Sequence, residues 1–526
     1  QGRLLTIFGT EKGLRYRIPW RPVPEVIAYL RAAATEDGER LGTMGDDGEK
    51  FGGWPGTAEL SWGQEAWVDA CFSALEGNAD WLTTVTPSDW MAANPPIGRI
   101  YVPTASYVEM TEWVLPVDEA PIFGKLLKDA VEAGSPAARF LRGGMWRNFA
   151  ARYREVNDLH KQMLRVSAAV DSMPPGPLRD RALDHLFRGQ SNDCYWHGLF
   201  GGIYLVHMRM ATLAELIAAE DLALGSGAAG GVADYDLDGR DEVLIGTVGQ
   251  TVLVDPAEGG GISSWDLRAS RVALASVMRR RPEAYHAKLK EAEAAAAPVG
   301  AATKAGAVSP HEGFTAKETG LSKLLVYDDH ERRSGLVRII DAQGNEVGDF
   351  VNGEWSVESA GGSKSVLARS DSDLRVQKTI ALEGDRMSGS LALSVEIAAE
   401  AAFAGTLELE WNLNLLGGGG NPEAYYDWSG QEIRHDAPGS VAASVALSFG
   451  NRYEGVAITV APEPAGAQVW FPVETVSNSE AGFERVYQGS CLVQRWPLNL
   501  AAGQSAAFIL NLTFHQDRDR AAEEAR

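Results

Sequence analysis

The sequence predicts an α/β unit at the N-terminus, a helical segment after it, and an all-β unit in the rest of the chain. Three observations support this order. Strand-like and helix-like runs alternate over about the first 75 residues, apolar residues recur at helical spacing between 126 and 219, and short β-rich runs separated by turn residues dominate after that. For 526 residues about three domains are expected, and we place them at 1–125, 126–220 and 221–526.

The α/β unit begins with a strand-like run, Arg3–Gly9. The segment Pro22–Pro24 then marks a helix start, because proline is favoured in the first helical turn. A second strand-like run, Arg40–Gly45, leads into the polar, glycine-rich stretch Asp46–Gly56, and another helix is expected over about Gly63–Leu75. Alternating strands and helices imply parallel strands joined by crossovers, and the loops after such strands often carry the chemistry.

Helical spacing continues in the second unit over Arg139–Leu164, Asp180–Arg188 and Gly201–Ala219. After an alanine-rich connection at Glu291–Val308, strand-like runs with turn signals between them recur to the end of the chain. This density of strands predicts a β-sandwich. The charged end, Arg518–Arg526, is expected to be a frayed tail.

Composition restricts the partners and the compartment. A net charge of −23 argues against duplex nucleic acid and anionic membrane surfaces, whereas a neutral polymer would feel no repulsion. Cys71, Cys194 and Cys491 are too far apart for a disulfide framework or a zinc pattern, so we expect single thiols in a reducing, cytoplasmic compartment. No apolar run approaches the roughly 20 residues of a membrane span, and no signal peptide is recognisable.

The stretch Gly45–Thr57 (GDDGEKFGGWPGT) holds the densest set of chemically useful side chains. Asp46, Asp47 and Glu49 lie within four residues, and Trp54 follows them. Glycoside cleavage uses two carboxyl groups, and sugars need apolar ring faces to lie against. Crowded carboxylates raise one another's pKa, which suits a proton donor. A solvated acidic turn is the alternative, and composition alone favours it.

The same stretch resembles the fourth conserved region of glycoside hydrolase family 57, in which Asp-x-Glu-x-Phe-Gly carries the catalytic acid/base aspartate. The resemblance implies that Asp47 is the acid/base, that Glu49 is a neighbouring sugar-binding carboxylate, and that Trp54 is a subsite platform. Asp46 would be a supporting partner. The choice of Asp47 over Asp46 rests on the Asp-x-Glu spacing.

Two later stretches resemble further regions of the same family. Tyr101–Pro116 (YVPTASYVEMTEWVLP) is similar to the next conserved region of the glucanotransferase branch, and it offers Glu109, Glu112 and Trp113 as cleft residues. A core position for Trp113 is an equally favoured alternative. Phe140–Leu164 resembles the central helical segment of the family, and its polar and aromatic residues are expected to be structural.

The stretch Gln190–His207 (QSNDCYWHGLFGGIYLVH) resembles a family region in which an aspartate and a tryptophan contact bound sugar. Asp193, Tyr195, Trp196 and His197 gather just before an apolar helix, which is unusual for core packing alone. We therefore expect Asp193 and Trp196 to bind substrate, and the role of His197 is left open.

The resemblance also implies a complete architecture: α/β plus all-β, with a partial (β/α)7 barrel, a helical segment and a C-terminal galactose-mutarotase-like β-sandwich. Family members place a His-Gln-Pro strand and the nucleophilic glutamate before the acid/base region. Only about 45 residues precede Asp47 here, and no His-Gln-Pro string occurs. Neither Glu49 nor Glu109 has the nucleophile role in the family pattern, so we expect the chain to lack the nucleophile.

The activity implied by the resemblance is that of a retaining 4-α-glucanotransferase, which cleaves an α-1,4 bond and transfers the glycosyl group to another glucan. An α-amylase-type hydrolase and a non-catalytic or truncated glucan-binding remnant are the alternatives. The expected partner is an α-1,4-glucan or malto-oligosaccharide, no nucleic acid or membrane is expected, and the oligomeric state is left open.

No cofactor is expected to be required, but one stretch resembles the start of a calcium loop. In Asp234–Glu242 (DYDLDGRDE), aspartates alternate with other residues and a glycine follows. Hard cations favour several oxygens on a tight turn. The full 12-residue EF-hand pattern is absent, so an acidic turn is favoured and calcium is the alternative.

Overall fold

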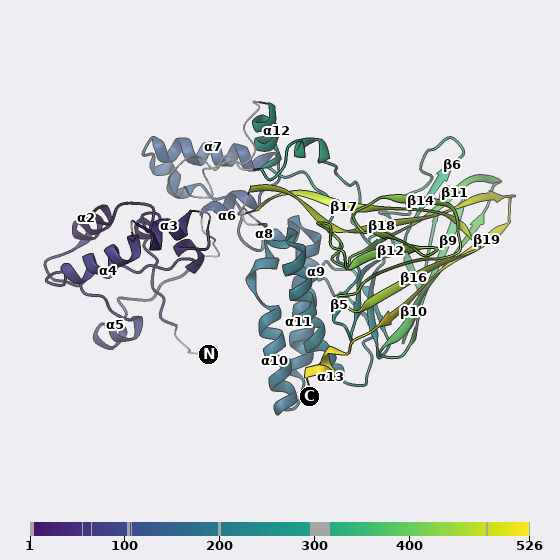
Figure 1. The fold of residues 1–526 in the computed structure, drawn as a ribbon, viewed down its shortest axis with the longest axis horizontal. Helices are drawn as coiled ribbons and strands as arrows, with labels where there is room; N and C mark the ends of the chain where they lie inside the picture. The colour runs from purple at the N-terminus through teal and green to yellow at the C-terminus, as the bar shows by residue number, and fades with distance from the viewer. Residues whose placement is uncertain are drawn as a thin grey trace. The chain divides into compact units, whose positions relative to one another are not determined.

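The computed structural model of the chain describes residues 5–54, 56–64, 66–102, 106, 108–197, 201–294, 316–479 and 482–524 (Figure 1). It divides into two compact units. The small unit comprises residues 1–105, 290–319 and 478–484, and the large unit comprises residues 106–289, 320–477 and 485–526. The domain boundaries at 125 and 220 stay a prediction.

The small unit is built from short helices: α1 (Lys12–Arg15), α2 (Val23–Ala33), η1 (Gly48–Phe51), α3 (Thr57–Trp62), α4 (Trp67–Gly77) and α5 (Pro87–Ala93). The two predicted helices are confirmed as α2 and α4. Val26 of α2 and Trp67 of α4 share one apolar core. The Trp67 indole donates to the Arg21 carbonyl (2.7 Å), which ties α4 to the start of α2.

The prediction of two strands in this unit is wrong for the described residues. Leu5–Gly9 is extended without strand pairing, and Leu5 is 87% exposed. Among the described residues, the two predicted strand regions meet in one parallel bridge, between Thr10 and Thr43. Alternating apolar residues become a strand only when a neighbour pairs with them and covers one face. The parallel direction of this bridge agrees with the predicted parallel strands, but the predicted partial barrel is not confirmed.

The large unit begins with helices: α6 (Val108–Trp113), α7 (Glu119–Glu132), η2 (Pro136–Phe140), α8 (Asn148–Arg152), α9 (Arg154–Asp171), α10 (Pro177–Gly189), η3 (Asn192–Tyr195), η4 (Gly202–Tyr204) and α11 (Val206–Leu224). Helices α9, α10 and α11 pack on one another. The predicted helices at 180–188 and 201–219 are confirmed within α10 and α11, although the second begins at Val206.

The helix predicted over Arg139–Leu164 is broken in the structure. Between η2 and α8 the chain runs against α6, where the Gly144 N–H donates to the Thr111 carbonyl (2.8 Å). A Cβ at Gly143 would overlap the Thr111 carbonyl, and a Cβ at Gly144 would overlap Val114. The glycine pair therefore permits a close backbone approach that a continuous helix would prevent.

A small antiparallel sheet joins the helices to the sandwich. Its five strands follow one another in chain order: β1 (Gly231–Ala233), β2 (Glu242–Gly246), β3 (Gln250–Asp255), β4 (Gly261–Leu267) and β5 (Val272–Ala273). Strand β5 contacts α11. Trp265 of β4 is fully buried and meets Trp411 of the sandwich edge to face (6.3 Å between ring centroids).

The predicted β-sandwich is present as two larger antiparallel sheets. One has nine strands in the order β13-β12-β15-β16-β19-β10-β9-β8-β7, and the other has five in the order β14-β17-β18-β11-β6. Their bounds are β6 (Leu336–Asp341), β7 (Ser356–Gly361), β8 (Lys364–Asp371), β9 (Leu374–Gly384), β10 (Ser388–Ala399), β11 (Phe403–Leu413), β12 (Ala424–Trp428), β13 (Gln431–Arg434), β14 (Gly439–Ser444), β15 (Leu447–Asn451), β16 (Val456–Glu463), β17 (Gly466–Ser479), β18 (Gly482–Leu500) and β19 (Ser505–Gln516).

Aromatic contacts between the sheets show that they pack face to face. Tyr426 of the nine-stranded sheet lies 5.7 Å from Trp470 of the other, and Phe508 lies 5.1 Å from Trp496. Buried and partly exposed residues alternate along strands such as β9 and β16, as expected where one face is covered. A galactose-mutarotase-like topology stays a prediction.

The charged C-terminal end is not a frayed tail over its described residues. It forms α13 (Arg520–Glu524), after α12 (His286–Ala294) earlier in the chain. Glu524 pairs with Arg271 (2.7 Å), and Asp519 pairs with Arg386 (2.6 Å). These ion pairs hold the end against the large unit, so the tail prediction is wrong here.

Two sequence expectations concern membranes and thiols. No described helix combines the length and the apolar character that crossing a membrane requires. Cys71, Cys194 and Cys491 are buried and form no disulfide.

Candidate active site

Asp47, the predicted acid/base, precedes the short 3-10 helix η1 in the small unit. Its side chain is 51% exposed, and one carboxylate oxygen lies 4.0 Å from an Arg15 guanidinium nitrogen. Glu49, two residues further, is also exposed. The loop therefore presents two carboxylates to solvent beside one cation.

Asp46 has different surroundings although it is the adjacent residue. Its side chain is only 3% exposed and forms an ion pair with Lys50. The Lys50 ammonium also donates to the Arg15 carbonyl (2.8 Å), and the Asp46 carboxylate accepts the Asp47 N–H (3.0 Å). Burial lowers the pKa of Lys50, and the Asp46 carboxylate opposes this shift. Asp46 thus holds the loop, while Asp47 remains exposed.

Trp54 is placed by a tight turn after η1. The Glu49 carbonyl accepts the N–H groups of Gly52, Gly53 and Trp54 (3.2, 2.7 and 3.0 Å). The half-buried Trp54 ring then stacks on Trp20, with 6.0 Å between centroids and 13° between planes. Trp20 was not predicted as a site residue, because only its contact with Trp54 identifies it.

A second aromatic pair lies in the large unit. Trp113, at the end of α6, stacks on Trp196 with 5.9 Å between centroids and 18° between planes, although 83 positions separate them in the sequence. Phe149 meets the Trp196 ring edge to face. The indole N–H of Trp196 is buried and has no hydrogen-bond partner within the described chain.

The other predicted residues of this region differ in exposure. Asp193 is exposed on η3, directly before Trp196. Burial raises the pKa of the Glu112 carboxyl, and Lys288 opposes this shift. The side chain of Glu109 lies outside the described residues.

His197, whose role was left open, is an interior residue. It is 3% exposed, and burial lowers its pKa. Its Nδ1 donates to the Gly201 carbonyl (2.8 Å), so Nε2 is the acceptor and receives the Tyr285 hydroxyl (3.2 Å). A neutral histidine with both nitrogens used supports the chain around Trp196 and does not face a ligand.

The predicted residues form two sets. Asp47, Glu49 and Trp54 belong to the small unit, whereas Trp113, Asp193 and Trp196 belong to the large unit. Within each set the structure brings a tryptophan pair together near an exposed carboxylate. The catalytic and binding roles of these residues stay predictions.

An interior cavity of about 70 Å³ lies elsewhere in the large unit. It is enclosed by α9, α11 and strands β3 to β5, and Asp158, Arg209, Trp265 and Asp266 are among its lining residues. None of the predicted site residues lines it. Both sets of candidate residues therefore lie outside this cavity.

The acidic stretch predicted as a possible calcium loop does bring its carboxylates together. Asp234, Asp236, Asp238 and Glu242 each place one oxygen within 4.8 Å of the others. Glu242 is 1% exposed, its Oε1 atom has no partner within the described chain, and burial raises its pKa to about 8. The guanidinium of Arg154 pairs with Asp236 beside this cluster. The donor set suits a hard cation.

The chain matches a known family over most of its length. Residues 234–508 match the model described as "Alpha-amylase/4-alpha-glucanotransferase, C-terminal", and residues 144–223 match the middle domain of the same family. Alpha-amylase 1 of Dictyoglomus thermophilum is 33% identical over 524 residues, which covers 96% of this chain and 74% of that protein. The 4-alpha-glucanotransferase of Thermococcus litoralis is 31% identical over 518 residues, with 94% and 72% covered.

The fold agrees with these sequence matches. The crystal structure of the Thermococcus litoralis 4-alpha-glucanotransferase superposes with a TM-score of 0.77 and 28% identity, and the match covers 98% of this chain and 73% of that protein. The chain thus spans about three quarters of the length of these relatives. On this evidence the chain belongs to the alpha-amylase/4-alpha-glucanotransferase family of glycoside hydrolases, as the resemblance to family 57 predicts.

Proposed function

We propose that this protein acts on α-1,4-glucans as a retaining 4-α-glucanotransferase, with Asp47 as its acid/base. The observation that carries the proposal is the difference between the two neighbouring aspartates. Asp46 is buried against Lys50, whereas Asp47 is half exposed on the same loop. The names of the relatives support the substrate class.

In the proposed mechanism, Asp47 donates a proton to the oxygen that links two glucose units. It then removes a proton from the acceptor hydroxyl when the glycosyl group is transferred. The stacked pair of Trp54 and Trp20 supplies an apolar face for a sugar ring. Glu49 is proposed to hydrogen-bond the sugar. We assign the carboxylate nucleophile to no residue of this sequence.

The second aromatic pair is proposed to bind the glucan as well. Trp113 and Trp196 offer ring edges and faces that are only half buried, and the Trp196 indole N–H has no partner among the described residues. Asp193 provides exposed acceptors on the adjoining turn. Aromatic acceptor subsites retain a glucan against water, so they favour transfer over the hydrolysis of an α-amylase.

Incubation with maltotriose tests the reaction type. Longer oligomers indicate transfer, whereas glucose and maltose alone indicate hydrolysis. Binding of maltoheptaose without turnover would support a glucan-binding chain that lacks its nucleophile. A chain that neither binds maltoheptaose nor turns over maltotriose would contradict the proposal.

Asp47→Asn tests the acid/base assignment. It should lower turnover of maltotriose by at least about 100-fold, because an amide cannot donate the proton, while maltoheptaose binding is retained. Asp80→Asn, at another exposed aspartate of the small unit, should leave turnover unchanged. Full activity of Asp47→Asn would exclude this residue as the acid/base. If the wild-type chain has no turnover, adding the nucleophile-bearing segment of a relative in trans would restore the assay.

A further inference from the structure

One buried carboxylate of the large unit is not explained by the proposed catalysis. Glu283 is 4% exposed and belongs to the segment between β5 and α12. It accepts hydrogen bonds from Arg152 (2.5 Å), from the Tyr153 hydroxyl (2.9 and 3.0 Å to its two oxygens) and from the Tyr204 hydroxyl (3.0 Å). A buried carboxylate with this many donors is held in one orientation.

Arg152 connects this carboxylate to Trp113. One of its terminal nitrogens donates to the Trp113 carbonyl and to the Leu115 carbonyl (2.6 Å), and the other bonds to Glu283. The last carbonyls of a helix have no partner within the helix, and a cation there is favoured by the helix dipole. Arg152 therefore fixes the C-terminal end of α6, where Trp113 lies.

The same segment also supports Trp196. Tyr285, two residues after Glu283, donates to His197, which follows Trp196 directly (3.2 Å). The Trp196 carbonyl accepts the Ile203 N–H (2.9 Å), so two contacts hold the chain on the C-terminal side of this tryptophan. The two stacked rings therefore depend on one short segment, although they come from distant parts of the sequence.

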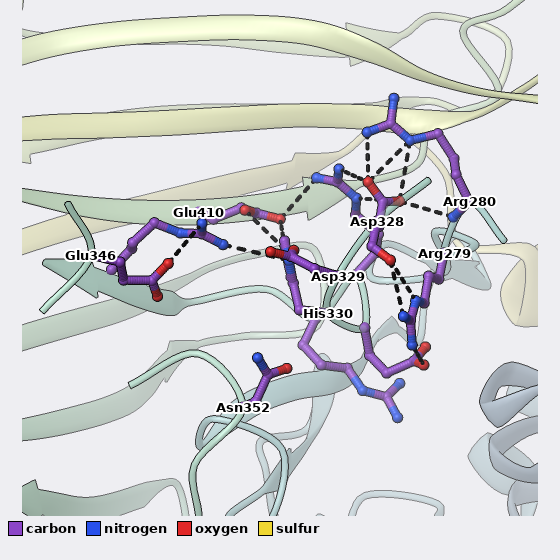
Figure 2. A network of polar contacts seen from close by, with 12 residues as sticks. Arg279, Arg280, Asp328, Asp329, His330, Glu346, Asn352 and Glu410 are labelled. Atoms are coloured by element: carbon purple, nitrogen blue, oxygen red, sulfur yellow. Dashed lines mark hydrogen bonds and ion pairs between the residues drawn. The ribbon is translucent and has the colours of Figure 1, made fainter. Parts of the chain in front are cut away.

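This segment is anchored to the β-sandwich. His286 donates through Nε2 to the Val476 carbonyl of β17 (2.9 Å), and its Nδ1 accepts the Glu283 N–H (3.1 Å). On the other side, Arg280 pairs with Asp328 (2.6 Å), as Figure 2 shows beside the Asp329–His330–Glu410 network. Because both ends are held by buried polar contacts, the segment cannot shift without breaking several of them.

We propose that Glu283 and Arg152 are positioning residues, which hold Trp113 against Trp196 so that the pair can receive a glucan. The sandwich would thus contribute to substrate binding through this segment, without contacting sugar itself. The inference rests on the proposed function, because it takes the tryptophan pair as a glucan subsite. Neither residue is proposed to contact the reacting atoms.

Glu283→Gln keeps the shape of the side chain but removes the charge that holds Arg152. We expect the Kd for maltoheptaose to rise about tenfold. In a Trp113→Ala, Trp196→Ala background the same substitution should change the Kd by less than about twofold, because the positioned pair is already absent. A role in stability alone would not produce this dependence on the tryptophans.

Glu220→Gln is the matched control. Glu220 is equally buried, at 6% exposure, and pairs with Arg165, but it touches none of the residues around Glu283. It should lower the melting temperature while leaving the Kd for maltoheptaose unchanged. Arg152→Lys is the second test variant, since a lysine cannot reach two carbonyls and Glu283 at once. It should weaken binding in the same way even if Glu283→Gln folds poorly.

A readout without ligand separates this inference from the proposed function. Two stacked indoles give a coupled circular dichroism signal, which Trp113→Phe identifies by its loss. Glu283→Gln should lose this signal and Glu220→Gln should keep it.

Retention of the signal in Glu283→Gln, or an undiminished effect on the Kd in the double-tryptophan background, would overturn the inference. Absence of maltoheptaose binding by the wild-type chain would contradict the proposed function instead, and the dichroism signal would still decide the positioning role.

Discussion

At the scale of single residues, Asp46 and Asp47 share one loop but differ in their ion pairs. A carboxylate that is buried against an ammonium group is held in one place. Asp46 meets Lys50 in this way. Among the described residues Asp47 pairs only with a guanidinium at 4.0 Å, so it can approach a bound molecule. The Asp-x-Glu spacing predicted the same choice, but it gave no physical reason for it.

A second residue-scale effect concerns acid stability. His435 is 1% exposed and donates through Nε2 to the Tyr425 carbonyl (2.9 Å), while its Nδ1 has no partner within the described chain. Burial lowers its pKa to about 4. The unfolded chain, with a pKa near 6.5, then binds more protons between pH 4 and 6.5. The free energy of unfolding should therefore fall as the pH drops through this window, by about 3 kcal/mol at pH 4.

Urea unfolding between pH 4 and 7 measures this effect. His435→Gln can keep the hydrogen bond to Tyr425 without titrating, so its free energy of unfolding should vary less with pH than that of the wild type. His515→Gln is the control, because His515 is exposed and should leave the wild-type pH dependence intact. Equal pH dependence in His435→Gln and the wild type would show that His435 does not titrate in this window.

At the scale of elements, the glycine pair before α8 decides how α6 is held. The chain passes so close to α6 that Cβ atoms at Gly143 and Gly144 would overlap Thr111 and Val114. We expect Gly143→Ala to lower the free energy of unfolding by about 2–4 kcal/mol, because the backbone must move to relieve the overlap. Gly361→Ala in β7, where a Cβ meets no atom within 4 Å, should change it by less than about 1 kcal/mol. Thermal denaturation of both variants would show whether the close approach exists.

The helices and strands that could be predicted are those in which the spacing of apolar residues reflects which face of the element is buried. Strands such as β16 alternate because one face is covered, and α9 to α11 carry apolar residues at helical spacing. The strand predicted at Arg3–Gly9 is a short apolar run, but Leu5 and Ile7 have no covering neighbour in the described chain and remain exposed. The helical prediction over Arg139–Leu164 is confirmed in part by α8 and α9, but the close approach at Gly143 and Gly144 interrupts the helix before them.

The candidate site shows the same division between local pattern and distant contact. Asp47, Trp54, Asp193 and Trp196 could be proposed because short motifs carry them. Short motifs could not identify Trp20, Arg152 and Glu283, because each of these residues acts through a partner that is remote in sequence. Lys50 could not be identified either, because its role depends on its burial. Glu283 contacts Arg152 across 131 positions, and no spacing rule connects two such residues.

At the scale of the whole chain, the sandwich and the helices of the large unit are joined by charged networks. Arg154 of α9 pairs with Asp255 of the small sheet (3.1 Å), and Arg333, which lies just before β6, pairs with Asp158 of α9 (2.6 Å). These contacts connect segments that are more than 100 positions apart. Breaking one partner of such a buried pair leaves an uncompensated charge, which costs more than the pair contributes.

The acidic cluster of Asp234, Asp236, Asp238 and Glu242 belongs to this junction, and calcium is the cation that we expect it to favour. Four carboxylate oxygens lie within 4.8 Å of one another, and the Arg154 guanidinium offsets their charge at Asp236 and Asp238. Bound calcium stabilises only the folded chain, so its removal should lower the melting temperature.

We expect EDTA to lower the melting temperature by several degrees and excess CaCl₂ to restore it. Glu242→Gln should have a lower melting temperature that no longer responds to either reagent, whereas Asp341→Asn, at an exposed turn of the same unit, should respond as the wild type does. An unchanged melting temperature in EDTA would mean that Arg154 and the backbone amides alone neutralise this turn, as expected for a simple acidic loop.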